Sequence, residues 1–97
     1  MAKQEFGPDF DAFESVTVST NSTALTTATL NDAQFALITV ETAAVRFRID
    51  GTAPTASVGH VLEPGDILEL DRNSQLAEIR FIRRDGVDAT LRVSYGN

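Results

Sequence analysis

Residues 43–70, AAVRFRIDGTAPTASVGHVLEPGDILEL, contain the clearest strand pattern in the chain. Apolar and polar residues alternate through 43–50, which is typical of a β-strand with one buried face. Gly51 and Pro54 interrupt that strand and begin a loop of small residues. A type II turn is predicted at residues 63–66, because Pro and Gly occupy its two central positions. We therefore expect three strands here, at residues 43–50, 60–62 and 67–71.

The same kind of segment recurs on both sides of this stretch. Short runs rich in β-branched residues are separated by polar turns, and Asp85-Gly86 is a strong hairpin signal. Residues 34–42 are apolar on both faces, which predicts a strand that is covered twice or buried at a subunit interface. The sequence predicts an all-β domain of about eight short antiparallel strands, a β-sandwich or jelly-roll-like barrel. The further strands are expected at residues 15–20, 24–30, 34–42, 76–84 and 89–95.

Composition excludes several classes of protein. A chain of 97 residues forms one domain, and without cysteine it has neither disulfides nor thiolate metal sites. The formal net charge of −6 opposes binding to nucleic acid or to an anionic membrane. No apolar run approaches the ~20 residues that span a bilayer, and MAKQEFGPDFD lacks the apolar core of a secretory signal. We expect a protein made in the cytoplasm.

The sequence contains no recognisable catalytic or metal-binding pattern. The one histidine, His60, has no cysteine partner and no HxH or HExxH spacing around it. There is no nucleophile elbow, and the loop at residues 51–59 lacks the lysine of a phosphate-binding loop. We expect no enzymatic activity, no cofactor and no metal.

Residues 1–14 differ from the rest and are predicted to form an N-terminal arm, followed by a single domain over 15–97. Phe6, Phe10 and Phe13 recur at helical spacing, i, i+4, i+7, on one face of a short helix. Asp9 and Asp11 would suit its N-terminal dipole. Such a helix is too short to be stable alone and must dock. It caps an open end of its own domain, inserts into a neighbouring subunit or larger partner, or stays disordered.

Arginines form the second candidate binding feature. Arg46 and Arg48 are expected on the outward face of one strand, since the alternating residues of that strand are apolar. If the strands are neighbours, Arg80 and Arg92 extend them into a basic stripe. The stripe is either a solvated face with cross-strand ion pairs or a recognition site for an acidic partner surface. A nucleic-acid role would need exposed aromatic residues among the arginines.

The run VRFRIDGTAPTASVGHVLEPGDILEL, followed by IRFIRRDGVDATLRVSYG, resembles a group of small proteins encoded among the virion genes of tailed bacteriophages. The resemblance covers about residues 35–97. It consists of an arginine-bearing strand, a GTAPT-like loop, an L-x-PG turn and two closing strands. The residues that carry it are Arg46, Arg48, Gly51 to Thr55, Gly59, Leu62, Pro64, Gly65, Arg80 to Arg83, Leu91, Val93 and Tyr95.

The resemblance implies a structural component of the virion, without implying a particular functional residue. The first expectation is a capsid decoration or cement protein that binds the major capsid protein or another virion protein, as a homo-oligomer and most simply a trimer. The second is a head–tail, tail or fibre-associated component. A carbohydrate-binding β-sandwich is a third reading, which the absence of tryptophan disfavours. The expected binding residues are Phe6, Phe10, Phe13, Asp9, Asp11, Arg46 and Arg48, and the expected location is the virion.

Overall fold

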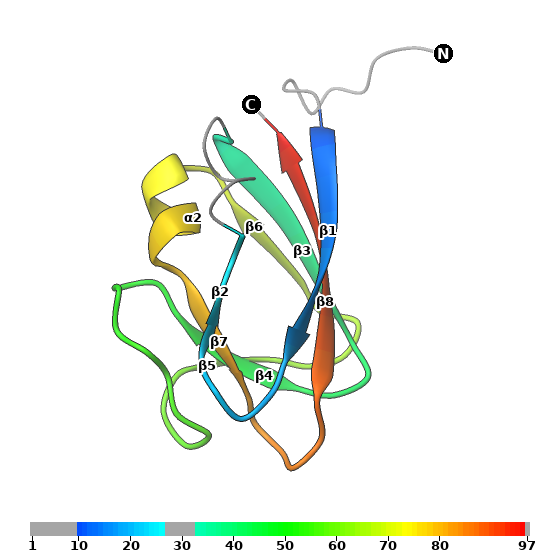
Figure 1. Ribbon diagram of the computed structural model, residues 1–97, viewed down its shortest axis with the longest axis vertical. Helices are drawn as coiled ribbons and strands as arrows, with labels where there is room; N and C mark the ends of the chain where they lie inside the picture. The colour runs from blue at the N-terminus through cyan, green and yellow to red at the C-terminus, as the bar shows by residue number, and fades with distance from the viewer. Residues whose placement is uncertain (1–9, 27–32, 97) are drawn as a thin grey trace.

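The computed structural model describes residues 10–26 and 33–96. Within these ranges the chain forms eight strands and one short helix, arranged as two antiparallel four-stranded sheets (Figure 1). The first sheet has the order β1-β8-β3-β6 and the second has the order β2-β7-β4-β5. The elements are β1 (Phe10–Val18), β2 (Thr23–Ala24), β3 (Phe35–Glu41), β4 (Val45–Arg48), β5 (His60–Leu62), β6 (Ile67–Leu70), α2 (Asn73–Glu78), β7 (Arg80–Arg83) and β8 (Ala89–Gly96).

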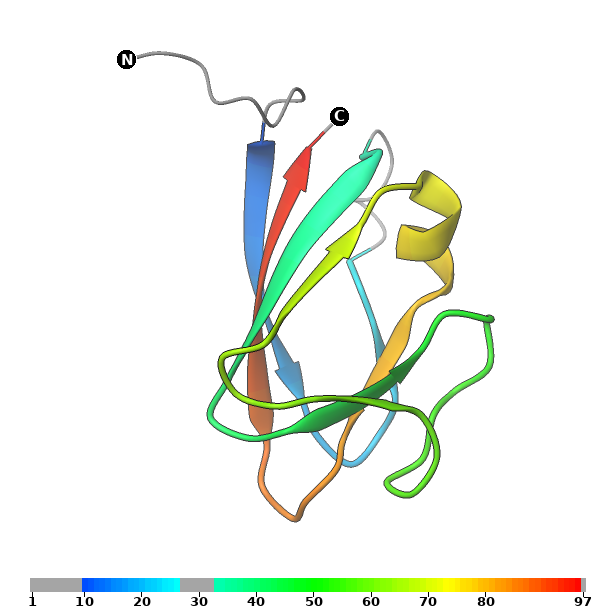
Figure 2. The same cartoon turned by 180° about the vertical axis from the view of Figure 1, so that it is seen from behind.

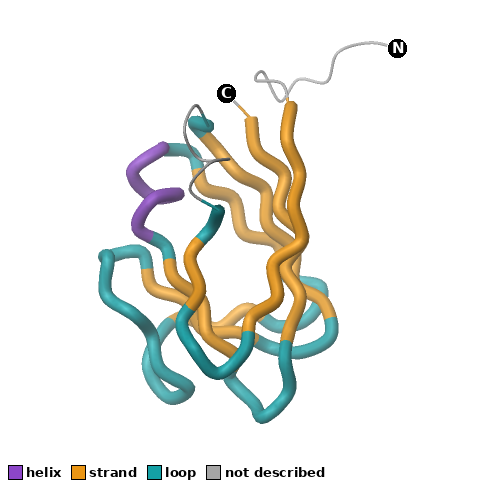
Figure 3. The backbone as a smooth tube through the Cα atoms, viewed as in Figure 1, coloured by secondary structure: helices purple, strands orange, loops and turns teal. Residues whose placement is uncertain are grey.

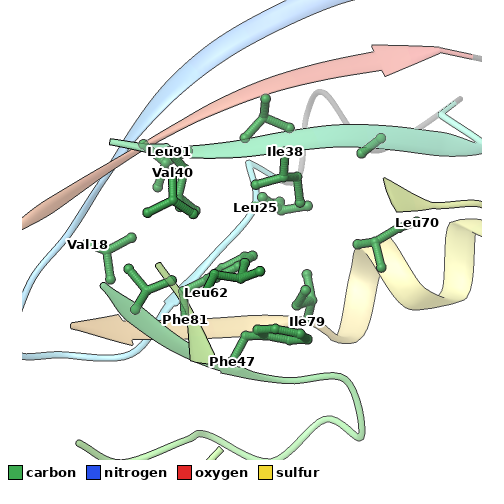
Figure 4. Close-up of a cluster of buried hydrophobic side chains, with 14 of the residues drawn as sticks. Val18, Leu25, Ile38, Val40, Phe47, Leu62, Leu70, Ile79, Phe81 and Leu91 are labelled. Atoms are coloured by element: carbon green, nitrogen blue, oxygen red, sulfur yellow. The ribbon is translucent and has the colours of Figure 1, made fainter. Parts of the chain in front are cut away.

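One apolar core lies between the two sheets. Side chains of the first sheet, such as Val40 and Leu91, face those of the second, such as Phe47 and Phe81 (Figure 4). No polar or charged residue is buried in the described part of the chain, so this core is built from hydrophobic side chains. The prediction of an all-β domain is confirmed.

The alternation along individual strands is also as expected. Val45 and Phe47 are buried, while Arg46 and Arg48 on the opposite face are half-buried. Leu91, Val93 and Tyr95 all point into the core from β8. In the predicted type II turn, Gly65 has φ +95°, a conformation that favours glycine.

The grouping of strands differs from the prediction. Residues 43–70 do not form one three-stranded unit, because β4 pairs with β5 in the second sheet while β6 pairs with β3 in the first. The Gly65 amide donates to the Val40 carbonyl at 2.9 Å, which places the turn against β3. Every connection except β4–β5 leads from one sheet to the other, as the passage from β1 to β2 illustrates in Figure 3.

The hairpin predicted at Asp85-Gly86 is wrong for the same reason. The turn joins β7 to β8, yet β7 pairs with β2 and β4, whereas β8 pairs with β1 and β3. Phe81 on β7 and Leu91 on β8 are both fully buried. They therefore point into the core from opposite sheets, whereas a hairpin would have placed their strands side by side in one sheet.

Residues 76–78 were predicted to begin a strand and instead end the helix α2. The turn of helix places Leu76 and Ile79, three residues apart, into the core together, and both are fully buried. The Asn73 side-chain amide donates to the Ala33 carbonyl at 2.7 Å, which fixes the helix to the segment before β3. Of the strand predicted at 24–30, the structure has only the short β2, and residues 27–32 lie outside the described ranges.

Candidate interaction surfaces

The predicted arm is partly a strand. Phe10 and Asp11 are the first residues of β1, which pairs with β8 from Phe10 opposite Gly96 to Val18 opposite Ala89. The helical interpretation of residues 6–13 is therefore wrong from Phe10 onward. Residues 12–18 continue the period-2 pattern of the strand, and the pairing with β8 outweighs the helical spacing of the phenylalanines. Phe6 and Asp9 lie outside the described residues.

Phe13 lies on the outer face of the first sheet, the face turned away from the core. The ladder places Phe13, Ser94, Leu37 and Glu69 side by side across the four strands. The next row along the strands contains Ser15, Arg92, Thr39 and Ile67. Seen from behind, the four strands run next to one another, and no element of the described chain crosses them on the outside (Figure 2).

This outer face has one exposed large hydrophobic residue on each edge strand and an ion pair on its two middle strands. Phe13 on β1 is 63% exposed and Ile67 on β6 is 62% exposed, although both are large hydrophobic residues. Leu37 lies half-buried between them. Arg92 pairs with Glu41 at 3.2 Å and donates to the Ser15 hydroxyl at 2.6 Å. The second apolar face predicted for residues 34–42 is thus an open surface of the domain. Among its described exposed residues, only Phe13 was a predicted binding residue.

Arg46 is used within the fold. It lies on the outer face of the second sheet, where its Nε donates to the Ala56 carbonyl and an Nη donates to the Gly59 carbonyl, both at 2.8 Å. These two bonds hold the loop of residues 51–59 against β4. The guanidinium suits this task because its donors are fixed in one plane. Arg46 is therefore a residue that positions the loop.

Arg48 pairs with Asp50, two residues further on, at 2.6 Å. The hydrogen bond from Arg48 lowers the pKa of the Asp50 carboxyl below its usual value. Arg80 lies directly opposite Arg48 in the ladder and donates to the carbonyls of Ala77 and Ile79 at 2.9 Å each. Arg46, Arg48 and Arg80 thus do form neighbours on one face, whereas Arg92 belongs to the other sheet.

The remaining paired arginines lie near the turns. Arg84 contacts Glu63 at 2.7 Å and Asp85 at 3.1 Å, and Arg83 contacts Asp88 at 2.7 Å. Hydrogen bonds to Asp85 and then Glu63 raise the pKa of Arg84 further above its usual value. The carboxylates of these pairs are more than half exposed, so each pair contributes little to stability.

An inward-pointing carboxylate was not predicted from the sequence. Glu14 on β1 faces the same way as the buried Val16, and it accepts hydrogen bonds from the Tyr95 hydroxyl and from the Thr26 hydroxyl and amide. Tyr95 is only 1% exposed, so its hydroxyl needs such an acceptor. This cluster ties β1 and β8 to the segment that follows β2. The inward position of Tyr95 was the available signal, because a buried tyrosine requires a partner.

His60 is the one histidine of the chain and lies in the described part. The His60 ring lies 5.2 Å from the Phe47 ring, centre to centre, at a tilt of 39°. His60 borders an open depression between the end of β4 and residues 58–60. No group of three metal-ligating side chains occurs in the part of the chain that the structure covers. None of its helices is long and apolar enough to cross a membrane. No family model, curated protein or solved structure matches the chain.

Proposed function

We propose that this protein is a structural component of a tailed-bacteriophage virion, and that it acts as a decoration or cement protein on the outer shell. The resemblance of residues 35–97 to small phage virion proteins supports the class. In this proposal the two packed sheets are a β-sandwich that serves as a rigid body, and its contacts with other virion proteins stabilise the shell. In this proposal the protein acts through protein–protein contacts and not through catalysis.

The observation that carries the proposal is the outer face of the first sheet. Phe13 and Ile67 expose large hydrophobic side chains at the two edges of this surface. Its described charges are Arg92, which pairs with Glu41, and Glu69. Exposed hydrophobic patches of this kind mark protein contact sites. By contrast, the charged groups Arg48, Arg83 and Arg84 are paired within the fold. A protein-binding role would therefore use the exposed hydrophobic residues on the outer face of the first sheet.

A role in the tail, the head–tail connection or a fibre would use the same surface. It would differ from a decoration role in the number of copies per virion. A carbohydrate-binding role is less well supported. Sugar-binding platforms use exposed aromatic rings, and the single tyrosine, Tyr95, is buried in the core. Phe13 is the one aromatic residue with a largely exposed side chain among those whose side chains the structure describes.

The test is binding to preassembled empty shells of the major capsid protein. We expect purified protein to bind each shell in many copies, as counted by quantitative mass spectrometry of the washed shells. Phe13→Asp should remove most of this binding, while Val87→Asp, the same change at a 54% exposed residue in the β7–β8 turn, should leave it intact. A few copies per virion would assign the protein to the tail instead, and no binding to virion proteins would refute the proposal.

A further inference from the structure

We infer that Asp85 is a site of spontaneous backbone modification, at which the aspartate isomerises to isoaspartate through a cyclic imide with Gly86. The sequence contains two Asp-Gly steps, Asp50-Gly51 and Asp85-Gly86, and all four residues are exposed. The structure distinguishes the two steps, because it holds one aspartate side chain more firmly than the other. The inference goes beyond the proposed function and does not depend on it, since the reaction needs only the folded chain and water.

The reaction needs a carboxyl group and a backbone nitrogen that can approach it. The Gly86 nitrogen attacks the carboxyl carbon of the Asp85 side chain, a C–N bond forms, and the carboxyl OH leaves with the amide proton as water. Water then breaks one of the two C–N bonds of the five-membered imide. When the bond to the α-carbonyl carbon breaks, the chain continues through the side-chain carbonyl and the product is isoaspartate. Glycine favours the reaction because it has no side chain to hinder the attack.

Asp50 is held by its neighbours on both sides along the chain. Both of its carboxylate oxygens accept hydrogen bonds from Arg48, at 3.2 and 2.6 Å, and one of them also accepts the Thr52 amide at 3.2 Å. The loop that follows is fixed to β4 by Arg46. The Asp50 carboxylate must therefore give up three hydrogen bonds, one of them to the backbone, before it can form the ring.

Asp85 is held by one side chain, and the backbone around it is less constrained. Its carboxylate accepts two hydrogen bonds from Arg84, at 3.2 and 3.1 Å, and Arg84 is shared with Glu63. In this described turn, the amides of residues 85–87 donate no hydrogen bond. Residues 85–88 are all exposed. The Gly86 nitrogen can therefore approach the carboxyl group without the loss of a backbone hydrogen bond.

The position of this turn should allow the domain to remain folded after the change. The turn joins β7 in the second sheet to β8 in the first, and the core residues Phe81 and Leu91 lie within those strands. Isomerisation adds a methylene group to the backbone at Asp85 and leaves the negative charge on the α-carboxylate. The exposed pair with Arg84 is lost, which costs little stability, and Arg84 keeps its contact with Glu63.

Incubation of the folded full chain, followed by protease digestion and electron-transfer mass spectrometry, tests the inference. Isoaspartate has the same mass as aspartate but gives different backbone fragments. A buffer near pH 6 keeps a small fraction of the carboxyl groups protonated and therefore reactive. We expect isoaspartate to form at Asp85 about fivefold faster than at Asp50, the factor that corresponds to one further hydrogen bond. In urea, where neither side chain is held, the two rates should be similar.

Three substitutions separate the reaction from its surroundings. Gly86→Ala should remove most of the product at Asp85, because the methyl group hinders the attack. The fold should tolerate this change, since an added Cβ meets nothing within 4 Å and the φ angle is not left-handed. Arg84→Gln should raise the rate at Asp85 about twofold without affecting Asp50, and Arg48→Gln should do the reverse. Circular dichroism checks that each variant remains folded.

Several results would overturn the inference. These are the absence of isoaspartate at Asp85, equal rates at Asp85 and Asp50 in the folded chain, and an undiminished yield in Gly86→Ala. A difference between the two sites that persists in urea would also overturn it, because the cause would then be the sequence and not the folded structure. The proposed function is decided separately by shell binding, so either can fail without the other.

Discussion

At the scale of single residues, Tyr95 and Glu14 form a part-buried hydrogen bond that joins β8 to β1. The Tyr95 ring is 1% exposed, and its hydroxyl donates to the Glu14 carboxylate. Burial, together with the hydrogen bond to Glu14, raises the pKa of the Tyr95 hydroxyl well above its usual value. The folded state therefore keeps a proton that the unfolded chain loses in alkaline solution.

This contact predicts a loss of stability at high pH. The unfolded tyrosine ionises near pH 10, so its contribution is complete below that pH and falls as pH rises toward the folded pKa. The free energy of unfolding should drop by about 1.4 kcal/mol per pH unit above pH 10. Urea unfolding between pH 9 and about 11.5 measures the slope. Tyr95→Phe should be less stable at neutral pH by about 1 kcal/mol and should lose the alkaline slope.

The alkaline measurement is clean because few other groups titrate there. Tyr95 is the only tyrosine of the sequence and Lys3 is the only lysine. The other seven basic residues are arginines, which remain charged throughout this pH range. A slope that persists in Tyr95→Phe would show that another group causes the alkaline instability. The phenolate absorbance of the single tyrosine provides a second measurement, and it should appear only as the protein unfolds.

One of the two partners in this contact was predicted from the sequence. The period-2 pattern of residues 89–95 predicted that Tyr95 points inward, and it does. Glu14 was not found, because the phenylalanine spacing placed residues 1–14 in a helix and began the first strand at Ser15. A single sequence cannot show that β8 offers a pairing edge to residues 10–14, and that pairing decides the conformation.

At the scale of elements, the loop of residues 51–59 shows how two arginines that look equivalent in sequence differ in role. Gly59 has φ +139°, and a side chain there would meet the Phe47 carbonyl at 3.1 Å. The loop therefore approaches β4 closely, and Arg46 holds it there through the carbonyls of Ala56 and Gly59. Arg48 reaches only Asp50, at the exposed end of the same strand.

We expect Arg46→Ala and Arg48→Ala to have different effects. Arg46→Ala removes two hydrogen bonds from a charged donor and should lower the free energy of unfolding by about 1–2 kcal/mol. It should also make the loop at 51–59 more sensitive to limited proteolysis. Arg48→Ala removes an exposed ion pair and should leave the melting temperature nearly unchanged. Equal effects of the two substitutions on loop cleavage would contradict the positioning role of Arg46.

Strand positions were predicted from the sequence, whereas the assignment of strands to sheets was not. Strand positions such as β4, β5 and β8 were predicted well because alternation and turn residues are local signals. Sheet membership is not local, so the Asp85-Gly86 turn was taken for a hairpin. The turn between β3 and β4 was also not marked by a turn-forming residue in the sequence. It lies at Thr42, whose φ of +82° is unusual for a β-branched residue, where glycine or asparagine would have marked a turn.

At the scale of the whole molecule, the pairing of β1 with β8 places residues 10–14, which were predicted to be part of the arm, in the first sheet. Phe10 lies opposite Gly96, so β1 begins where β8 ends, at one end of the domain (Figure 1). Residues 1–9 lie outside the described ranges. Residues 10–14 belong to the folded domain, where they pair with the end of β8 and supply Glu14.

Two truncations distinguish these boundaries. Deleting residues 1–9 should leave the domain folded, with a cooperative thermal transition close to that of the full chain. Deleting residues 1–14 should destabilise it severely, because the deletion removes half of an edge strand and the acceptor of the buried Tyr95 hydroxyl. That loss is large against the roughly 5–15 kcal/mol that stabilises such domains. Circular dichroism melts of the three proteins provide the comparison, and a stable, cooperative domain after deletion of 1–14 would contradict the assignment of β1.

The shorter truncation also separates the arm from the sheet face as contact sites. Residues 1–9 contain Phe6 and Asp9 of the predicted binding residues, whereas Phe13 remains on the outer face of the first sheet. If shell binding depends on the sheet face alone, the protein lacking residues 1–9 should bind as well as the full chain and should still respond to Phe13→Asp. Loss of binding in the truncated but folded protein would instead assign the contact to the arm. If the deletion of residues 1–9 and Phe13→Asp each remove part of the shell binding, both the arm and the sheet face contact the shell.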